Sequence, residues 1–146
     1  RAFFEETLQD LEASRKDPIS FIIVDLNGLK LANDSFGHSA GDKLIRRTAE
    51  VLKASIENGT IPARIGGDEF ILIMPGANEQ AAKDMVERVE SLVMMNNKCY
   101  REPELSVAVG ASTSAPGFSL LKFISLADDE MYKNKGIHHR RRRDDA

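Results

Sequence analysis

The apolar positions of the chain follow two spacings, one typical of amphipathic helices and the other of buried strands. Apolar side chains recur every three or four residues in five segments, which predicts five helices. The helices are expected from Phe3 to a stop at residues 15–18, and over residues 28–36, 39–56, 79–95 and 119–135. Runs of alternating or continuous apolar residues predict strands at residues 19–24, 60–63, 70–74 and 105–110. This order predicts an α+β fold with a central, mostly antiparallel sheet and helices packed on it.

The stretch Arg64–Phe70 joins two of the predicted strands through a Gly-Gly pair. Glycine accepts the positive φ of a tight turn, so Gly66 and Gly67 predict a β-hairpin. The turn carries two acids, Asp68 and Glu69, which are poor strand formers. A solvated turn explains them in the simplest way, whereas a bound cation is the functional alternative.

Another acid follows the apolar run of residues 19–24, which is predicted to be a buried strand. Asp25 therefore lies at the C-terminal end of a central strand. If that strand lies beside the hairpin, Asp25 and Asp68 converge, which is how oxygen ligands hold hard divalent cations. The spacing alone does not establish that the two strands are neighbours.

Two sequence blocks resemble those of the GGDEF family. Residues 66–70 match its Gly-Gly-Asp-Glu-Phe motif, and residues 25–42 are similar to its D-x-[DN]-x-[FL]-K-x-x-N-D-x-x-G-H-x-x-G-D block. The similarity extends from Arg1 to about Lys135. It implies the nucleotide-cyclase, palm-like GGDEF fold. It also implies a diguanylate cyclase, which condenses two GTP molecules into cyclic di-GMP as a homodimer. Some members of the family have lost this activity, so a catalytically inactive GTP-binding or regulatory module is the alternative.

The resemblance assigns a catalytic set that binds Mg²⁺ or Mn²⁺. By this likeness Asp25 and Asp68 bind the ions, and the carbonyl of Leu26 supplies a third oxygen. Glu69 matches a position that helps to bind metal or takes the proton of the attacking hydroxyl, and the sequence does not decide between the two. Metal ions and fixed donors are expected to carry most of the catalysis, because negative charge spreads over the phosphate oxygens in the transition state.

Phosphate binding is expected at the start of the helix over residues 28–36. Free N–H groups of Gly28, Leu29 and Lys30, together with the helix dipole, favour an anion there. Lys135 matches a family lysine that also reaches the phosphates, although Gly136 and His139 depart from the usual x-x-G-R-N continuation. Arg140 is a possible substitute for the missing arginine. A simple cation at a helix C-terminus is the alternative for Lys135.

Guanine recognition is implied for Asn33 and Asp42, which match the corresponding pair of the family. Asp42 has a competing explanation, because residues 39–42 also resemble a capping box at the start of a helix. His38 is expected to shape the loop and is not placed in the catalytic set. At the position where many members carry R-x-x-D and bind cyclic di-GMP, this chain has Glu57 and Thr60, which predicts weak product inhibition.

Length and composition are those of one ordinary globular domain. The 146 residues have a formal net charge of −3 and a single cysteine, Cys99, which permits a reducing, cytoplasmic location. We expect a GGDEF domain over residues 1–137, with its leading segment and a sensory or regulatory domain missing, and a basic then acidic tail over residues 138–146. No signal peptide or membrane segment is expected. Nucleic-acid binding through Arg140–Arg143 is disfavoured, because no aromatic residues or second basic face accompany that run.

Overall fold

The computed structural model of the chain describes residues 1–145, with side chains described for residues 1–135. This part forms five helices and four strands in the order that the hydrophobic pattern predicts. The elements are α1 (Ala2–Ala13), β1 (Ile19–Leu26), α2 (Leu29–Phe36), α3 (His38–Ser55), β2 (Ile61–Arg64), β3 (Glu69–Pro75), α4 (Glu79–Cys99), β4 (Val107–Thr113) and α5 (Leu120–Asp145). The predicted α+β class is confirmed.

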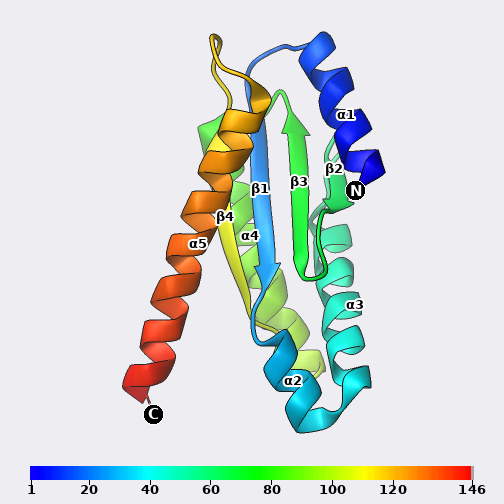
Figure 1. Cartoon of the computed structure of the whole chain (residues 1–146), viewed down its shortest axis with the longest axis vertical. Coiled ribbons are helices and arrows are strands. Elements are labelled where there is room, and N and C mark those ends of the chain that lie inside the picture. Colours follow the sequence, from blue (N-terminus) through cyan, green and yellow to red (C-terminus); the bar gives the residue numbers. More distant parts are fainter. Residues whose placement is uncertain (146) are drawn as a thin grey trace.

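The four strands form one antiparallel sheet in the order β2-β3-β1-β4 (Figure 1). All eight residues of β1 are buried, because this strand is paired on both sides and covered on both faces. The sequence run of residues 19–24 is accordingly apolar without alternation, as in strands that are covered on both faces.

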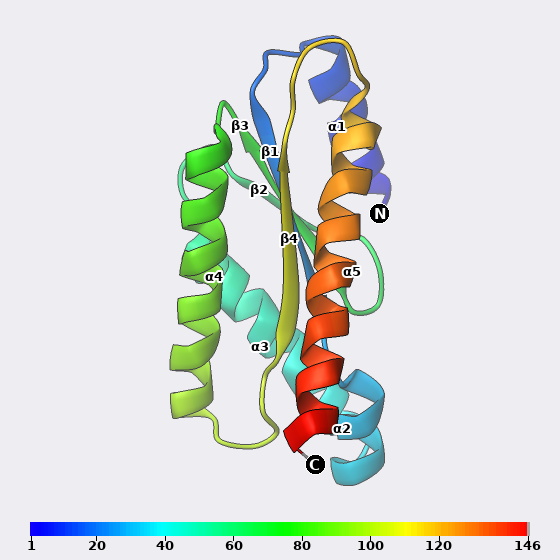
Figure 2. The same ribbon diagram turned by 90° about the vertical axis from the view of Figure 1, so that its left-hand side faces the viewer.

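Helices cover both faces of the sheet. Figure 2 shows α1 and α5 on one side, α3 and α4 on the other, and α2 beyond one end. Two buried clusters correspond to these faces, one joining the sheet to α2, α3 and α4 and the other joining it to α1 and α5. Alternate residues of β1 face opposite clusters, so Ile23 lies on the α5 side and Val24 on the α3 side. Among the described residues, no helix is apolar enough over a sufficient length to cross a bilayer.

Helix α5 approaches β4 very closely at Gly110. A Cβ atom at this position would lie 2.9 Å from the Cα of Met131 and closer still to the backbone carbonyl oxygen of Ala127. The side chain of Asn134 donates a hydrogen bond to the carbonyl of Val109, and the hydroxyl of Ser112 donates one to α5. Glycine is therefore required for packing, and it sets the position of α5 over the sheet.

Two predicted helix ends are wrong. Asn96 and Asn97 are expected to stop α4, but the helix continues to Cys99 because tertiary contacts hold both side chains. Asn96 accepts a hydrogen bond from the buried Arg47, and Asn97 bonds both Arg47 and the backbone of Leu105. Helix α5 continues past Lys135 to Asp145, while the side chains of the expected tail, residues 138–146, lie outside the described ones. The domain boundary at residue 137 stays a prediction.

Candidate functional site

The connection between β2 and β3 places its two acids at the end of β1. The backbone N–H of Ile65 donates to the carbonyl of Glu69 at 2.9 Å, at the base of a four-residue connection over residues 65–68. The carbonyl of Asp68 accepts a hydrogen bond from the N–H of Leu26 at 2.8 Å. The expected neighbourhood of β1 and the hairpin is therefore present. The expected positive φ is wrong for both Gly66 and Gly67, because this connection is longer than the two-residue turns that require it.

Asp25 and Glu69 face the same side of the sheet. They are direct partners in the antiparallel register of β1 and β3, and paired residues project from the same face. This is the face that α5 covers, since Ile23 and Ile71 on the same side belong to the cluster beneath α5. Asp25 is only 8% exposed. Two carboxylates are thus held side by side under a helix, an arrangement that is unfavourable unless positive charge or a proton compensates them.

Helix α5 supplies both a cation and another acid to this place. The ammonium group of Lys135 lies 2.8 Å from Oδ2 of Asp25 and donates a hydrogen bond to it. Asp128, two turns earlier on the same helix, lies close enough to Glu69 for its charge to raise the pKa of that carboxyl. Asp128 is not among the site residues predicted from the sequence, although its spacing of seven residues from Lys135 places the two on one helix face. The helix-terminus explanation of Lys135 is wrong, because α5 does not end there.

Burial and crowding raise the pKa values of the two paired acids. Burial raises the pKa of Asp25, the ion pair with Lys135 opposes that shift, and the charges of Asp68 and Asp128 add to it. Burial, followed by the charge of Asp128 and that of Asp25, raises the pKa of Glu69 to about 7. The site therefore holds more negative charge than Lys135 neutralises.

One oxygen of Asp25 lacks a partner. Its Oδ1 is buried and accepts no hydrogen bond within the described part of the chain, although Oδ2 is paired with Lys135. Such an orphan acceptor is costly unless a donor or cation reaches it. Among residues 1–135, no three side chains of His, Cys, Asp or Glu form a cluster that could hold a metal ion by themselves. A divalent ion bound at Asp25 would need a backbone oxygen as well, and the carbonyl of Leu26 is the predicted one.

The segment after β1 turns directly into α2. Gly28 is the N-cap of that helix and has a φ of 71°, a left-handed conformation that explains glycine there. Leu29 and Lys30 open the helix, so their N–H groups are among the four that lack partners within it. Figure 1 shows the start of α2, the β2–β3 connection and the C-terminal half of α5 at the same end of the sheet. The predicted phosphate-binding segment thus lies at the same end of the sheet as Asp25 and Glu69.

Asn33 and Asp42 lie on the facing helices α2 and α3. The side-chain carbonyl of Asn33 accepts a hydrogen bond from the N–H of Gly41 at 2.8 Å. A Cβ at Gly41 would overlap the Asn33 amide, so glycine makes this contact possible. Asp42 is exposed. Its explanation as a capping-box residue is wrong, because α3 begins at His38 after Gly37 and has no side-chain cap. Recognition of a base by this pair stays a prediction.

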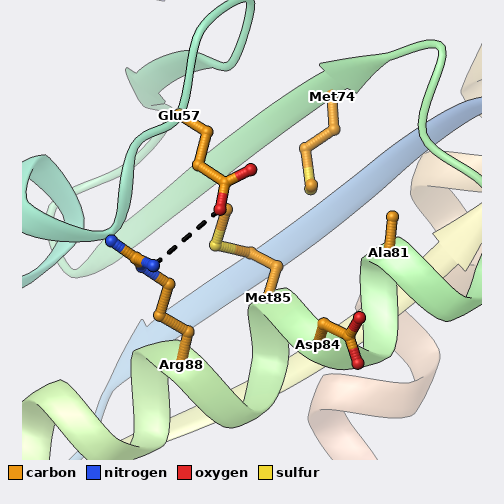
Figure 3. Close-up of a pocket in the computed structure, with 6 residues that line it drawn as sticks. All are labelled: Glu57, Met74, Ala81, Asp84, Met85 and Arg88. Carbon is orange, nitrogen blue, oxygen red and sulfur yellow. Dashed lines mark ion pairs between the residues drawn. The ribbon is translucent and has the colours of Figure 1, made fainter.

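A separate cavity lies between α4 and the segment that follows α3. It measures about 260 Å³, and Met74 and Met85 line it together with Glu57 and Arg88. Figure 3 shows Glu57 and Arg88 facing each other there, and their closest charged atoms are 3.8 Å apart. Glu57, which stands where many family members carry an arginine that binds cyclic di-GMP, is thus paired with the guanidinium of Arg88.

Comparisons with known proteins agree on one family. The family model described as "Diguanylate cyclase, GGDEF domain" matches residues 1–141. Diguanylate cyclase A of Treponema denticola is 28% identical over 83% of this chain and 33% of that protein. Diguanylate cyclase DgcS of Shewanella oneidensis is 29% identical over 92% of this chain and 46% of its own length. The GGDEF domain of DgcB from Caulobacter crescentus, solved in complex with c-di-GMP, has a TM-score of 0.80 at 26% identity, covering 92% of this chain and 84% of that one. The chain spans less than half of either curated relative.

Proposed function

Because the chain belongs to the GGDEF family of diguanylate cyclases, we propose that it condenses two molecules of GTP into cyclic di-GMP and releases two pyrophosphates. The observation that carries this proposal is the group of acids at the end of β1, the buried Asp25 and the half-buried Asp68, Glu69 and Asp128. There Asp25 presents an unpaired oxygen beside Glu69, and Lys135 supplies the neighbouring positive charge. Excess negative charge around one buried orphan oxygen fits a divalent cation, for which Mg²⁺ or Mn²⁺ is the proposed ion.

The acids hold the ion, and the surrounding groups bind the substrate. Asp25 and Asp68 would contribute carboxylate oxygens and Leu26 its carbonyl. When bound, the ion supplies positive charge to the phosphate oxygens and lowers the pKa of the attacking hydroxyl. The raised pKa of Glu69, about 7, suits either a ligand that releases its proton when a cation binds or a base for the 3′-hydroxyl.

The phosphates of GTP are proposed to bind at the start of α2. The N–H groups of Gly28, Leu29 and Lys30 and the ammonium of Lys30 favour an anion at that end. Lys135 lies beside the same place, since it pairs with Asp25. Its ammonium has three donors, so the ion pair leaves donors for a phosphate oxygen. In each condensation step a 3′-oxygen forms a bond to an α-phosphorus while the bond to the pyrophosphate oxygen breaks.

The base is proposed to bind between α2 and α3. Because the Asn33 carbonyl is already bonded to Gly41, its NH₂ group remains for an acceptor on guanine. The Asp42 carboxylate accepts from two adjacent guanine donors, the ring N–H and the exocyclic amine. Each subunit would hold one GTP, so two copies must face each other for both bonds to form, which is why we propose a homodimer.

Incubation of the protein with GTP and Mg²⁺, followed by mass spectrometry, tests the activity. Cyclic di-GMP should form, and EDTA should abolish its formation. Dilution should lower the specific activity, because the reaction needs two subunits. GTP binding shown by calorimetry without any cyclic di-GMP, at protein concentrations where dimers are present, would favour the inactive GTP-binding module instead.

A further inference from the structure

Two arginines hold the backbone of the connection that carries Asp68 and Glu69. The guanidinium of Arg64 donates from Nε to the carbonyl of Gly66 at 3.1 Å and from Nη2 to that of Gly67 at 2.6 Å. The guanidinium of Arg1 donates to the carbonyl of Ile65 at 3.1 Å. Three successive carbonyls of the connection are thus bonded to arginine side chains.

The fourth carbonyl of the connection is held as well. The oxygen of Asp68 accepts from the backbone of Leu26 in β1. Each carbonyl oxygen over residues 65–68 therefore has a donor that lies outside those four residues. Such complete pairing is unusual for an exposed Gly-Gly segment, because glycine loses more conformational entropy on ordering than any other residue.

The two arginines reach the connection from opposite sides of the sheet. Arg64 belongs to β2 beside Phe70, whose side chain lies in the cluster of the α3 and α4 face. Arg1 is the N-cap of α1, which covers the other face together with α5. The acids Asp25 and Glu69 lie on that second face, so Arg64 supports the connection from the side away from them. Arg64 is therefore placed to fix the backbone and not to neutralise the acids.

The space around the glycines shows what this support achieves. A Cβ at Gly67 would meet no atom within 4 Å, so side-chain packing contributes nothing to the order of this peptide. Hydrogen bonds to the carbonyls are then the main restraint on the direction in which Asp68 points. A forked guanidinium can bond two adjacent carbonyls at once, whereas the ammonium of a lysine has no fixed fork.

We propose that Arg64 is a positioning residue, which, with support from Arg1, fixes the peptides of Gly66 and Gly67 so that Asp68 and Glu69 stay aimed at the end of β1. The part of this inference that concerns a bound cation rests on the proposed function. The ordering of the connection does not rest on it.

Amide hydrogen exchange in the protein free of metal and nucleotide tests the ordering. The reporters are the amides of Gly66 and Leu26, which donate to the carbonyls of Glu69 and Asp68. In Arg64→Ala their exchange should accelerate about 10- to 100-fold, the effect of losing charge-assisted hydrogen bonds, while Ile22 in the middle of β1 keeps its rate. Arg64→Lys should resemble Arg64→Ala, because charge alone does not replace the fork.

Chemical rescue and a matched control separate positioning from general destabilisation. Methylguanidinium should restore protection in Arg64→Ala, and Arg101→Ala, which removes an exposed arginine from the loop after α4, should leave exchange unchanged. Unchanged protection of Gly66 and Leu26 in Arg64→Ala would overturn the inference. Exchange that also accelerates at Ile22 would overturn it, since that result indicates a loss of global stability.

Calorimetric titration with Mn²⁺ tests the link to the acids. The affinity of Arg64→Ala for Mn²⁺ should fall about tenfold, because binding must then reorder a connection that two charge-assisted bonds hold in the wild type. Wild-type affinity in a variant with accelerated exchange would overturn the positioning role. A further outcome is that the wild-type protein forms no cyclic di-GMP while Arg64→Ala still shows faster exchange and weaker Mn²⁺ binding than the wild type. That combination would refute the proposed function and still support this inference.

Discussion

Replacement of Gly110 by alanine should move α5 away from the sheet and destabilise the protein. The added Cβ would lie 2.9 Å from the Cα of Met131 and closer than that to the carbonyl oxygen of Ala127 and the N–H nitrogen of Met131, whereas ordinary Cβ contacts begin near 3.4 Å. The opposing atoms belong to the backbone of a helix, so no side-chain rotation can relieve the overlap. The helix or the strand must shift as a whole.

The expected loss of stability follows from two opposing effects. Overpacking of a well-packed core costs about 1–3 kcal/mol. Against this, Gly→Ala lowers the entropy of the unfolded chain, which stabilises by about 0.4–1 kcal/mol. The free energy of unfolding should therefore fall by about 1–2 kcal/mol, which for a chain of this length lowers Tm by about 2–8 °C.

Thermal unfolding of Gly110→Ala and of Gly67→Ala provides the comparison. The same methyl group at Gly67 meets no atom within 4 Å, and that residue has no positive φ, so its Tm should stay near the wild-type value. The shift of α5 should also lengthen the 2.8 Å ion pair between Lys135 and Asp25. Equal Tm values for the two variants would refute the packing role of Gly110.

Four further predictions concern the site. Asp68→Asn should lower turnover by about 10²-fold or more while the fold survives, and near-native turnover would contradict its assignment as an ion ligand. Because the pKa of Glu69 is raised from 4.5 to about 7, this side chain keeps its proton in the folded protein at pH values between these two, where the unfolded chain has lost it. The free energy of unfolding should therefore fall as pH rises through that window. Thermal melts across this range should show the fall in wild type and lose most of it in Glu69→Gln, and an identical pH profile in that variant would exclude Glu69 as its source. Asp42→Ser should relax the preference for GTP over ATP and yield adenine-containing products by mass spectrometry, and an unchanged preference would exclude Asp42 as the base reader. Cyclic di-GMP should inhibit only weakly, since Glu57 is paired with Arg88 and repels a phosphate, and tight binding by calorimetry that depends on Glu57 would contradict this.

The sequence predicts the order of the elements well, because each is marked by an apolar period or by a continuous apolar run. The run of residues 19–24 marks the central strand, and the motif at Asp68 marks the hairpin beside it. Contacts between distant elements are not visible in this way. The pairing of Lys135 with Asp25 joins positions 110 residues apart and depends on the close approach at Gly110. Asp128 was missed for the same reason.

Local rules also failed where tertiary contacts compete with them. Asparagine favours helix ends in general, yet Asn97 continues α4 because the backbone of Leu105 satisfies its side chain. The capping explanation of Asp42 failed because Gly37, which has a φ of 92°, already provides the break before α3. A distant partner, Leu105, thus determines where α4 ends, and a neighbouring glycine, Gly37, determines where α3 begins.

The unpaired, buried Oδ1 of Asp25 couples the folding equilibrium of the domain to the binding of a ligand at that oxygen. Desolvation of that carboxylate is a free-energy penalty that the folded chain bears and the unfolded chain does not. Any ligand that binds there in the native state alone shifts the equilibrium by mass action, by about 2.7 kcal/mol at a concentration one hundred times its dissociation constant. A cation that binds in this way at the end of β1 would make the folded population of this domain depend on the concentration of that cation.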